Sequence, residues 1–194
     1  MSTLIFATNN QHKVDEIRTV IGSTFNIITL AEANINIDIP EPHDTIEENA
    51  EEKSSFIFKL TNKDCFGEDT GLEVEALNGE PGVKSARYAG DGRSSLDNIK
   101  KLLQNLQEID NRKAHFKTII SLVLDGKSYS FEGICKGTIT KELKGVDGFG
   151  YDPIFVPEGS TKTFAEMTME EKNIYSHRRK ATDKLINFLS NKQS

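Results

Sequence analysis

The chain has 194 residues, of which 36% are hydrophobic and 28% are charged, as in an ordinary globular protein with a full core. No apolar run approaches the ~18 residues of a membrane span, and the opening "MSTLIFATNN" has neither a charged segment nor a cleavage site for export, so we expect a cytoplasmic protein that does not bind membranes. A formal net charge of -6 argues against a nucleic-acid partner, because a polyphosphate backbone needs a broad basic face.

Strands and helices alternate in the first half of the predicted order. They are expected at residues 3–8 (strand), 11–22 (helix), 25–30 (strand), 45–60 (helix) and 64–77 (two strands around a tight turn). Gly22 is the expected end of the first helix. Thr45 and Glu48 form the Thr-x-x-Glu capping box that opens the second helix.

The second half adds a helix, a pair of strands and a glycine-rich loop. These are expected at residues 94–106 (helix), 115–124 and 128–139 (antiparallel strands around an Asp-Gly turn) and 145–156 (loop entering a strand). Thr168 and Glu171 cap the last helix. A parallel-type start followed by a hairpin predicts an α/β fold with a mixed sheet covered by helices, in two lobes with a cleft between them.

The stretch "TNNQHK", residues 8–13, lies where a strand ends and a helix begins. Backbone N–H groups and the positive end of the helix dipole then point at the space above the turn, and Lys13 adds a full charge. This arrangement favours a phosphate site, although asparagine is also a preferred N-cap residue and plain capping explains the segment by itself. The chain contains no GxxxxGK[ST] motif, so the segment is not a P-loop.

Lys53 falls on the apolar stripe of the second helix. The other members of that stripe are Ile46, Ala50, Ile57 and Leu60. A lysine at such a position must either extend its ammonium group to the edge of the core or meet an anion. For this residue alone both interpretations stay open.

Two adjacent carboxylates, Glu68 and Asp69, stand at the end of a predicted strand. They repel one another unless a proton or a cation relieves them, so a hard, oxygen-binding ion such as Mg²⁺ is a natural partner, and Glu41 on a Pro-bounded loop could supply a further oxygen. The alternative is that the two side chains point in opposite directions and that Asp69 accepts a hydrogen bond in a turn. The pair itself does not decide between the two.

Residues 145–179 combine a glycine-rich loop with a helix whose apolar face carries a charge. The loop "GVDGFGYDP" suits close backbone approach to a flat ring that stacks on Phe149 or Tyr151. The face of the last helix consists of Ile174, Arg178, Ala181, Leu185 and Phe188. An arginine there indicates a planar or anionic partner, with His177 beside it as a second donor, whereas a rim arginine with a buried stem is the alternative. Together with the preceding segments, these features describe a nucleoside triphosphate site.

The motifs that carry this prediction resemble those of the inosine/xanthosine triphosphate pyrophosphatases along nearly the whole chain. They are, in order, "TNNQHK", "IEENAEEK", "EDTGLEVEAL", "PGVKSARYAG", "GFGYDPIF" and "EEKNIYSHRRKA". The resemblance implies one domain over residues 1–194, with an elongated mixed sheet in two lobes and the site in the cleft. It also implies a homodimer that uses Mg²⁺ to hydrolyse deaminated purine nucleoside triphosphates (ITP, dITP, XTP) to the monophosphate and pyrophosphate.

The resemblance further assigns roles to single residues. Those implied for the triphosphate are Thr8, Asn10, Lys13 and Lys53, with Thr70 as an adjoining substrate contact. Those implied for the base are Phe149, Gly150, Tyr151, Asp152, Lys172, His177 and Arg178. Asp69 matches the catalytic acid-base residue, and Glu41 and Asp69 match metal positions, to which the charge argument above adds Glu68. Asn9 stands in the substrate-binding turn where the family usually has glycine, and because asparagine tolerates positive φ we expect the turn to survive.

The mechanism follows from charge. Water that attacks the α-phosphorus must lose a proton while the pyrophosphate leaving group gathers negative charge, so the site needs a base near the water and cations along the triphosphate. Asp69 is the expected base, and Lys13, Lys53 and Lys172 are the expected cations. No covalent intermediate is expected, because the two cysteines have no paired base in the motifs and the chain has no Gly-x-Ser-x-Gly.

Two rival functions stay open. The septum-inhibitor-like nucleotide pyrophosphatases have a similar architecture but prefer pyrimidine or modified nucleotides, and the "SHR" and "GFGYDP" blocks favour the purine interpretation. A catalytically silent nucleotide-binding regulator would need no base beside the α-phosphate, so Asp69 and Glu68, together with three lysines, weigh against it.

Overall fold

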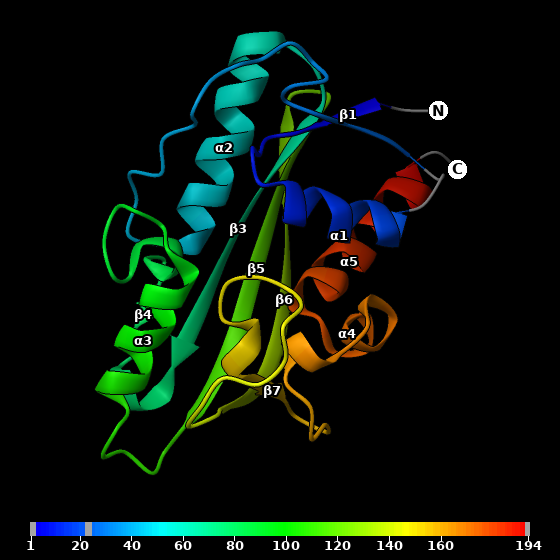
Figure 1. Ribbon diagram of the computed structural model, residues 1–194. Coiled ribbons are helices and arrows are strands. Elements are labelled where there is room, and N and C mark those ends of the chain that lie inside the picture. Colours follow the sequence, from blue (N-terminus) through cyan, green and yellow to red (C-terminus); the bar gives the residue numbers. More distant parts are fainter. Residues whose placement is uncertain (1–2, 22–24, 193–194) are drawn as a thin grey trace. The chain divides into compact units, whose positions relative to one another are not determined.

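The computed structural model describes residues 3–21 and 25–192 (Figure 1). The strands are β1 (Thr3–Phe6), β2 (Asn26–Thr29), β3 (Cys65–Val74), β4 (Pro81–Gly82), β5 (Lys113–Leu124), β6 (Lys127–Ile139) and β7 (Phe155–Pro157). The helices are α1 (Gln11–Ile21), α2 (Ile46–Thr61), α3 (Ser95–Asn105), α4 (Met169–Tyr175) and α5 (His177–Lys192). Among the described residues, no helix combines the length and the apolar character that a membrane crossing requires.

The strands form one mixed sheet in the order β2-β1-β3-β5-β6-β7, with β4 paired to β3. β1 runs parallel to β2 and to β3, whereas the β3–β4 and β6–β7 pairs are antiparallel. The predicted α/β class, a mixed sheet flanked by helices, is therefore confirmed. The predicted cleft between two lobes and the single domain over residues 1–194 stay predictions.

The chain divides into two compact units. Unit 1 consists of Met1–Asp69, Thr118–Gly133 and Arg178–Ser194, and unit 2 consists of Thr70–Lys117 and Ile134–His177. The three long strands β3, β5 and β6 contribute residues to both units. The boundary in β3 falls between Asp69 and Thr70, two of the predicted site residues.

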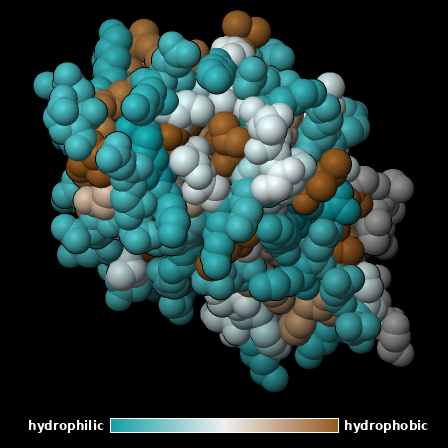
Figure 2. Space-filling model, turned by 90° about the horizontal axis from the view of Figure 1, so that it is seen from below, coloured by the Kyte–Doolittle hydropathy of each residue, from teal (hydrophilic) through white to brown (hydrophobic). Residues whose placement is uncertain are grey.

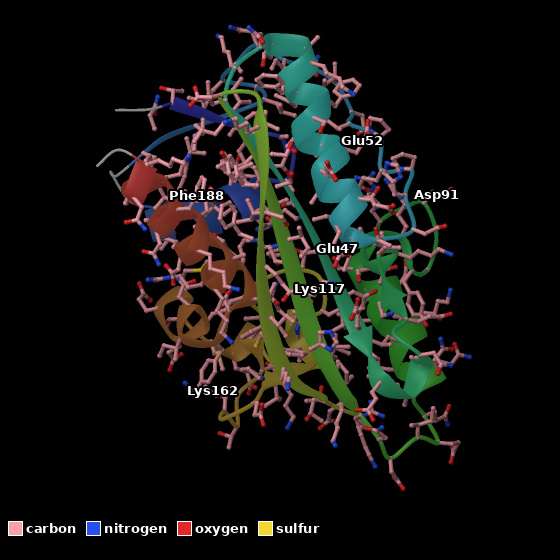
Figure 3. The ribbon with its side chains drawn as sticks, turned by 180° about the vertical axis from the view of Figure 1, so that it is seen from behind. Glu47, Glu52, Asp91, Lys117, Lys162 and Phe188 are labelled. Carbon is pink, nitrogen blue, oxygen red and sulfur yellow. The ribbon has the colours of Figure 1, made fainter. Side chains whose placement is uncertain are left out.

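Strands of unit 1 bury both of their faces. One face packs against α1 and α5 and includes Phe6 and Phe66, and the other packs against α2 and includes Ile5 and Cys65 (Figure 1). Because successive side chains of a strand point to opposite faces, neighbouring residues of β3 meet different helices. On the first of these faces lies Phe188 of α5 (Figure 3), which packs on Tyr129. The centroids of the two rings are 4.4 Å apart.

Unit 2 has a core of its own, built around α3 and a group of aromatic rings. Ile99, Leu102 and Leu106 of α3 are buried there. Phe116 of β5 meets Phe155 edge-on, with 4.7 Å between the ring centroids and 63° between the ring planes. These rings also border the segment that carries the predicted base-recognition residues.

Local sequence signals placed most element ends correctly. Thr45 and Thr168 cap α2 and α4, each accepting a hydrogen bond from the backbone of the glutamate three residues later. The Asp125-Gly126 turn between β5 and β6 has φ values of 50° and 73°, as a two-residue hairpin requires. The predicted stop of the first helix at Gly22 lies outside the described residues.

Two expected elements were wrong. β3 is one continuous strand, without the predicted turn after Asp69, because β4 pairs with Leu72 and Glu73 and keeps the chain extended. The last predicted helix is two helices, α4 and α5, which meet at Ser176. Two residues assigned to apolar stripes are exposed instead: Leu60 at 56% and Ile174 at 72% of their full accessible surface.

The exposed large hydrophobic side chains are scattered along the sequence. They are Leu60, Leu96, Leu143, Val146, Met169 and Ile174. On the face drawn in Figure 2, hydrophilic residues predominate and hydrophobic atoms form small separate groups. The homodimer stays a prediction.

Candidate active site

The predicted site residues divide between the two units. Unit 1 contains Thr8, Asn9, Asn10, Lys13, Glu41, Lys53, Glu68, Asp69 and Arg178. Unit 2 contains Thr70, Phe149, Gly150, Tyr151, Asp152, Lys172 and His177. The residues predicted for the triphosphate and the metal thus lie in unit 1, except Thr70, and those predicted for the base lie in unit 2, except Arg178.

The N-terminus of α1 is capped from within the predicted phosphate segment. Asn10 Oδ1 accepts a hydrogen bond from the Lys13 backbone N–H at 3.3 Å, and the Asn10 N–H donates to Thr8 Oγ1 at 3.1 Å. The exposed Asn9 donates its side-chain amide to the Ile37 carbonyl at 2.9 Å, and its φ is not positive. The turn therefore forms without the glycine that the resemblance would place at position 9.

Glu68 and Asp69 point to opposite faces of β3. Glu68 lies on the face of Phe66, toward α1 and α5, and Asp69 lies on the face of Cys65, toward α2. Both residues are buried, with 1% and 7% of their surface exposed. Of the two arrangements that the sequence left open, the structure shows the one in which the carboxylates diverge.

Gly67 allows α2 to lie close to β3. A Cβ atom at position 67 would lie 2.6 Å from the Ala50 carbonyl oxygen and 2.7 Å from Lys53 Cβ, distances that real contacts do not reach. The missing side chain thus brings Lys53 alongside Asp69. Gly67 is not among the predicted site residues, although a glycine inside a strand is a known sign of close backbone approach.

Lys53 is buried between carboxylates. Its Nζ lies 2.6 Å from Glu41 Oε1 and 2.8 Å from Asp69 Oδ1, and it donates to the Glu68 backbone carbonyl at 3.2 Å. Burial by itself lowers the pKa of Lys53, but the charges of Asp69 and Glu41 outweigh burial and raise that pKa. Of the two alternatives for this lysine, the anionic partner is the one that the structure contains.

Arg178 is the centre of a second ion-pair group, on the other face of β3. Its Nε donates to Glu68 Oε2 at 2.9 Å and its Nη2 to Glu68 Oε1 at 3.1 Å, while Nη1 pairs with Glu16. Lys13 Nζ lies 3.3 Å from Glu68 Oε1. Burial alone would lower the pKa of Arg178, but Glu68 and Glu16 raise it. The prediction that Arg178 recognises the base stays a prediction, and the structure adds an ion-pair role.

These side chains leave an excess of negative charge in unit 1. The cations are Lys13, Lys53 and Arg178, and the carboxylates are Glu16, Glu41, Glu68 and Asp69. Burial raises the pKa of Asp69, against the lowering effects of Lys53 and Lys13, and burial also lowers the pKa of Lys13. A carboxylate with a raised pKa accepts a proton more readily, as a general base must.

Glu41 and Asp69 have the chemistry of magnesium ligands. Their oxygen atoms converge on the Lys53 ammonium group, each within 2.8 Å, so one cation is already shared between them. Mg²⁺ in proteins commonly takes one or two carboxylates and completes its shell with water and substrate phosphate, so this pair fits the ion. Within residues 3–21 and 25–192, no three His, Cys, Asp or Glu side chains together form a metal site. Both oxygens of Glu68 face Arg178, and its metal role stays a prediction.

In unit 2, Asp152 fixes the glycine-rich loop. Its Oδ2 accepts a hydrogen bond from the Phe149 N–H at 2.9 Å and pairs with Lys172 Nζ at 2.7 Å. Gly148 has a φ of 76°, and a Cβ there would lie 2.2 Å from Asp152 Oδ2, so only glycine fits. The Lys172 ammonium also lies 5.2 Å from the centroid of the Phe149 ring. One buried carboxylate therefore positions both the loop and the lysine.

The two aromatic residues of the loop differ in exposure. Tyr151 is 4% exposed, and its hydroxyl donates to the Ser85 carbonyl at 2.9 Å. Phe149 is half-buried, as is Thr70 in β3, and Gly150 has a φ of 61°. Of the two rings predicted to stack on a base, Phe149 is the one that is partly exposed and can contact a ligand.

His177 is held by an aromatic partner that sequence analysis did not identify. Its ring stacks on Phe116, with 4.6 Å between the centroids and 14° between the planes, and it is 3% exposed. Phe116 lies on β5, more than fifty positions from His177 in the sequence, and no motif links the two. The aromatic contact fixes the plane of the imidazole ring.

Comparisons with known proteins show which family the chain resembles. A model of the Ham1 family matches residues 4–188. The dITP/XTP pyrophosphatase of Flavobacterium johnsoniae is 51% identical over 187 residues, which cover 96% of this chain and 97% of the relative. That of Porphyromonas gingivalis is 49% identical over 190 residues, covering 97% and 98%. The solved Ham1 protein structure from Staphylococcus aureus has a TM-score of 0.90 at 40% identity, and that from Coxiella burnetii 0.89 at 34%; each comparison covers 98% of this chain and 100% of the other.

Proposed function

The chain belongs to the Ham1 family, and we propose that it hydrolyses deaminated purine nucleoside triphosphates (ITP, dITP and XTP) to the monophosphate and pyrophosphate. The observation that supports this proposal most strongly is the buried Asp69 carboxylate, which pairs with Lys53 at 2.8 Å and also feels the positive charge of Lys13. A base flanked by cations is what hydrolysis of a phosphoric anhydride requires. The same residues would be unnecessary in a silent nucleotide sensor.

Asp69 acts as the base in this proposal. It orients the attacking water and takes its proton as the water adds to the α-phosphorus. Burial raises the pKa of Asp69, which makes its carboxylate a stronger base. Lys53 and Lys13, the latter at the N-terminus of α1, neutralise the triphosphate together with the helix dipole.

Glu41 and Asp69 hold Mg²⁺ in this proposal. When bound, the ion supplies positive charge to phosphate oxygens and lowers the pKa of water. Glu41 is the more accessible ligand, because 25% of its side chain is exposed, against 9% for Asp69. The Glu41→Gln substitution is therefore expected to weaken Mg²⁺ binding and to leave the fold unaffected.

Recognition of the base is assigned to unit 2. Phe149 offers its ring for stacking, and Lys172 and His177 offer donors to a 6-oxo purine, which carries an acceptor where adenine carries an amino group. Rejection of GTP needs a further feature, because guanine also has the 6-oxo group. We assign that feature to crowding or a missing acceptor around residues 149–152. The homodimer and the cytoplasmic location belong to the same proposal.

The test is a substrate panel of ITP, dITP, XTP, GTP, ATP and UTP with product identification in ¹⁸O-labelled water. We expect ITP, dITP and XTP to be preferred over GTP, ATP and UTP, and the label to appear in the monophosphate and not in pyrophosphate. Release of orthophosphate would instead indicate an ordinary triphosphatase. Preference for UTP would favour a septum-inhibitor-like activity, and absence of any product would favour a regulator.

A further inference from the structure

Lys53 stands at the point where the two candidate metal ligands meet. Its ammonium group lies 2.6 Å from Glu41 Oε1 and 2.8 Å from Asp69 Oδ1. The third acceptor is the Glu68 backbone carbonyl at 3.2 Å, so the three N–H donors of the ammonium group have three oxygen partners in unit 1. A lysine that only awaited a phosphate group would keep its ammonium in solvent, whereas Lys53 is 7% exposed.

A metal ion and this ammonium group cannot occupy the same oxygens together. Mg²⁺ binds carboxylate oxygens at about 2.0–2.1 Å, so an ion on Glu41 Oε1 and Asp69 Oδ1 would lie close to the ammonium group, and the two cations would repel each other. The Lys53 backbone is fixed by the close packing of α2 on Gly67, so the flexible four-carbon side chain is the part that moves.

We propose that Lys53 is the built-in counter-ion of the metal site, which a divalent cation displaces from Glu41 and Asp69 and which then becomes available to the triphosphate. This inference rests on the proposed Mg²⁺ site and adds an order of events to it. In the metal-free protein Lys53 is a positioning residue, because it keeps two mutually repelling carboxylates together. In the metal-loaded protein the same group is a phosphate ligand, so metal binding prepares substrate binding.

The test measures binding of Mn²⁺, used as a paramagnetic probe, to the substrate-free full chain by electron paramagnetic resonance. Three proteins are compared: wild type, Lys53→Met and Lys13→Met. Lys13 is the matched control, since it is a lysine of the same charged group that contacts Glu68 and not Glu41. We expect Lys53→Met to bind Mn²⁺ about 10-fold more tightly or better, and Lys13→Met to change the affinity less than about 3-fold.

The direction of the change is diagnostic. A substitution that merely damages the site weakens metal binding, whereas removal of a competing cation strengthens it. Unchanged or weaker binding in Lys53→Met overturns the inference. Equal tightening in both variants also overturns it, because that result reflects the general loss of positive charge. Absence of Mn²⁺ binding in all three proteins overturns it as well.

A second measurement uses the wild-type protein and decides the question if Lys53→Met fails to fold. Acylation of lysines by a small reagent is followed by mass spectrometry at increasing Mg²⁺. Labelling of Lys53 is expected to rise as the ion releases its ammonium group, while labelling of the exposed Lys63 stays constant. Constant labelling of Lys53 overturns the inference. Pyrophosphate release from ITP is measured separately, so an active enzyme whose Lys53 is not displaced keeps the proposed function and loses only this inference.

Discussion

The two units hold their functional side chains by different means. In unit 1, buried ion pairs join residues far apart in the sequence: Arg178 pairs with Glu68 and Glu16, which lie 110 and 162 positions away. In unit 2, Asp152 bonds to Phe149 and Lys172, 3 and 20 positions away, and aromatic packing does the rest. Unit 2 therefore combines a short-range ion-pair group with aromatic packing, whereas unit 1 depends on buried charges that only the complete fold brings together.

This difference predicts unequal sensitivity to substitution. Removal of one charge in unit 1 leaves its partners buried without compensation, which costs more than the pair contributes. The His177 ring of unit 2 is held by stacking on Phe116, so its substitution is expected to disturb the fold less. The expected effects below run from the charged group of unit 1 to single groups in either unit.

The largest effect is expected for Arg178→Met. Loss of the guanidinium leaves Glu68 and Glu16 buried without their cation, so the free energy of unfolding in urea should fall by about 3–5 kcal/mol. The control is the neighbouring Arg179→Met, whose pair with Asp183 is partly exposed and is expected to contribute only about 0.3–0.5 kcal/mol. Equal losses in the two variants would contradict the ion-pair role.

The same protein also tests the base-recognition hypothesis for Arg178. If Arg178 reads the base, kcat/KM falls far more for ITP than for ATP. If Arg178 instead acts through Glu68 on Lys13, kcat/KM falls equally for both substrates, because Lys13 would contact only phosphate. Measuring both substrates on one preparation separates these outcomes without reference to stability.

Asp69→Asn is expected to lower kcat for ITP by at least ~100-fold, with a modest change in KM, because the substitution keeps the shape and removes the base. Glu73→Gln is the control: it removes a carboxylate from the same strand, one that pairs with the partly exposed His115 at 2.8 Å. Near-normal turnover of Asp69→Asn in steady-state kinetics would refute the assignment of the base.

In unit 2, His177→Leu is expected to reduce selectivity and leave the charged group of unit 1 intact. Loss of one donor to the 6-oxo group should lower kcat/KM for ITP relative to ATP by roughly 5- to 150-fold. His115→Leu is the control, since His115 is partly exposed and belongs to the same unit. An equal fall of kcat/KM for ITP and ATP would mean that His177 stabilises the aromatic core by stacking on Phe116 and does not recognise the base.

The fold could be predicted where the signal is local. The spacing of apolar residues and the capping residues predicted the helices, and Asp125-Gly126 predicted the hairpin. Each of these features acts within a few residues. The tight turn predicted within residues 64–77 was wrong, since the pairing of β4 with β3 keeps the strand extended. The same limit explains the single predicted helix after residue 168: the break at Ser176 leaves no local signal beyond the serine itself.

For the candidate site, residue types could be predicted but partners could not. For the arginine and the lysine on apolar stripes, an anionic partner was one of two alternatives, and nothing in the sequence pointed to Glu16 as the partner of Arg178. Gly67 and Phe116 act by shape, one by allowing contact and the other by stacking, and neither carries the charge that draws attention to a site. Physical chemistry thus predicted what each group needs, and the fold determined which residue supplies it.

The smallest expected effect uses the cysteines, one in each unit, as probes of local opening. Cys65 in unit 1 and Cys135 in unit 2 are buried free thiols. Burial, with a contribution from Asp64, raises the pKa of Cys65 to about 12, so at pH 8 only about one thiol in ten thousand is ionised while the protein stays closed. Labelling by an aromatic disulfide reagent must therefore proceed through local opening of the protein.

In single-cysteine proteins made with Cys135→Ser or Cys65→Ser, we expect Arg178→Met to accelerate labelling of Cys65 and to leave the labelling rate of Cys135 unchanged. Equal acceleration at both thiols would show that the two units open together, and the ion pairs of unit 1 would then stabilise the whole chain and not their own unit.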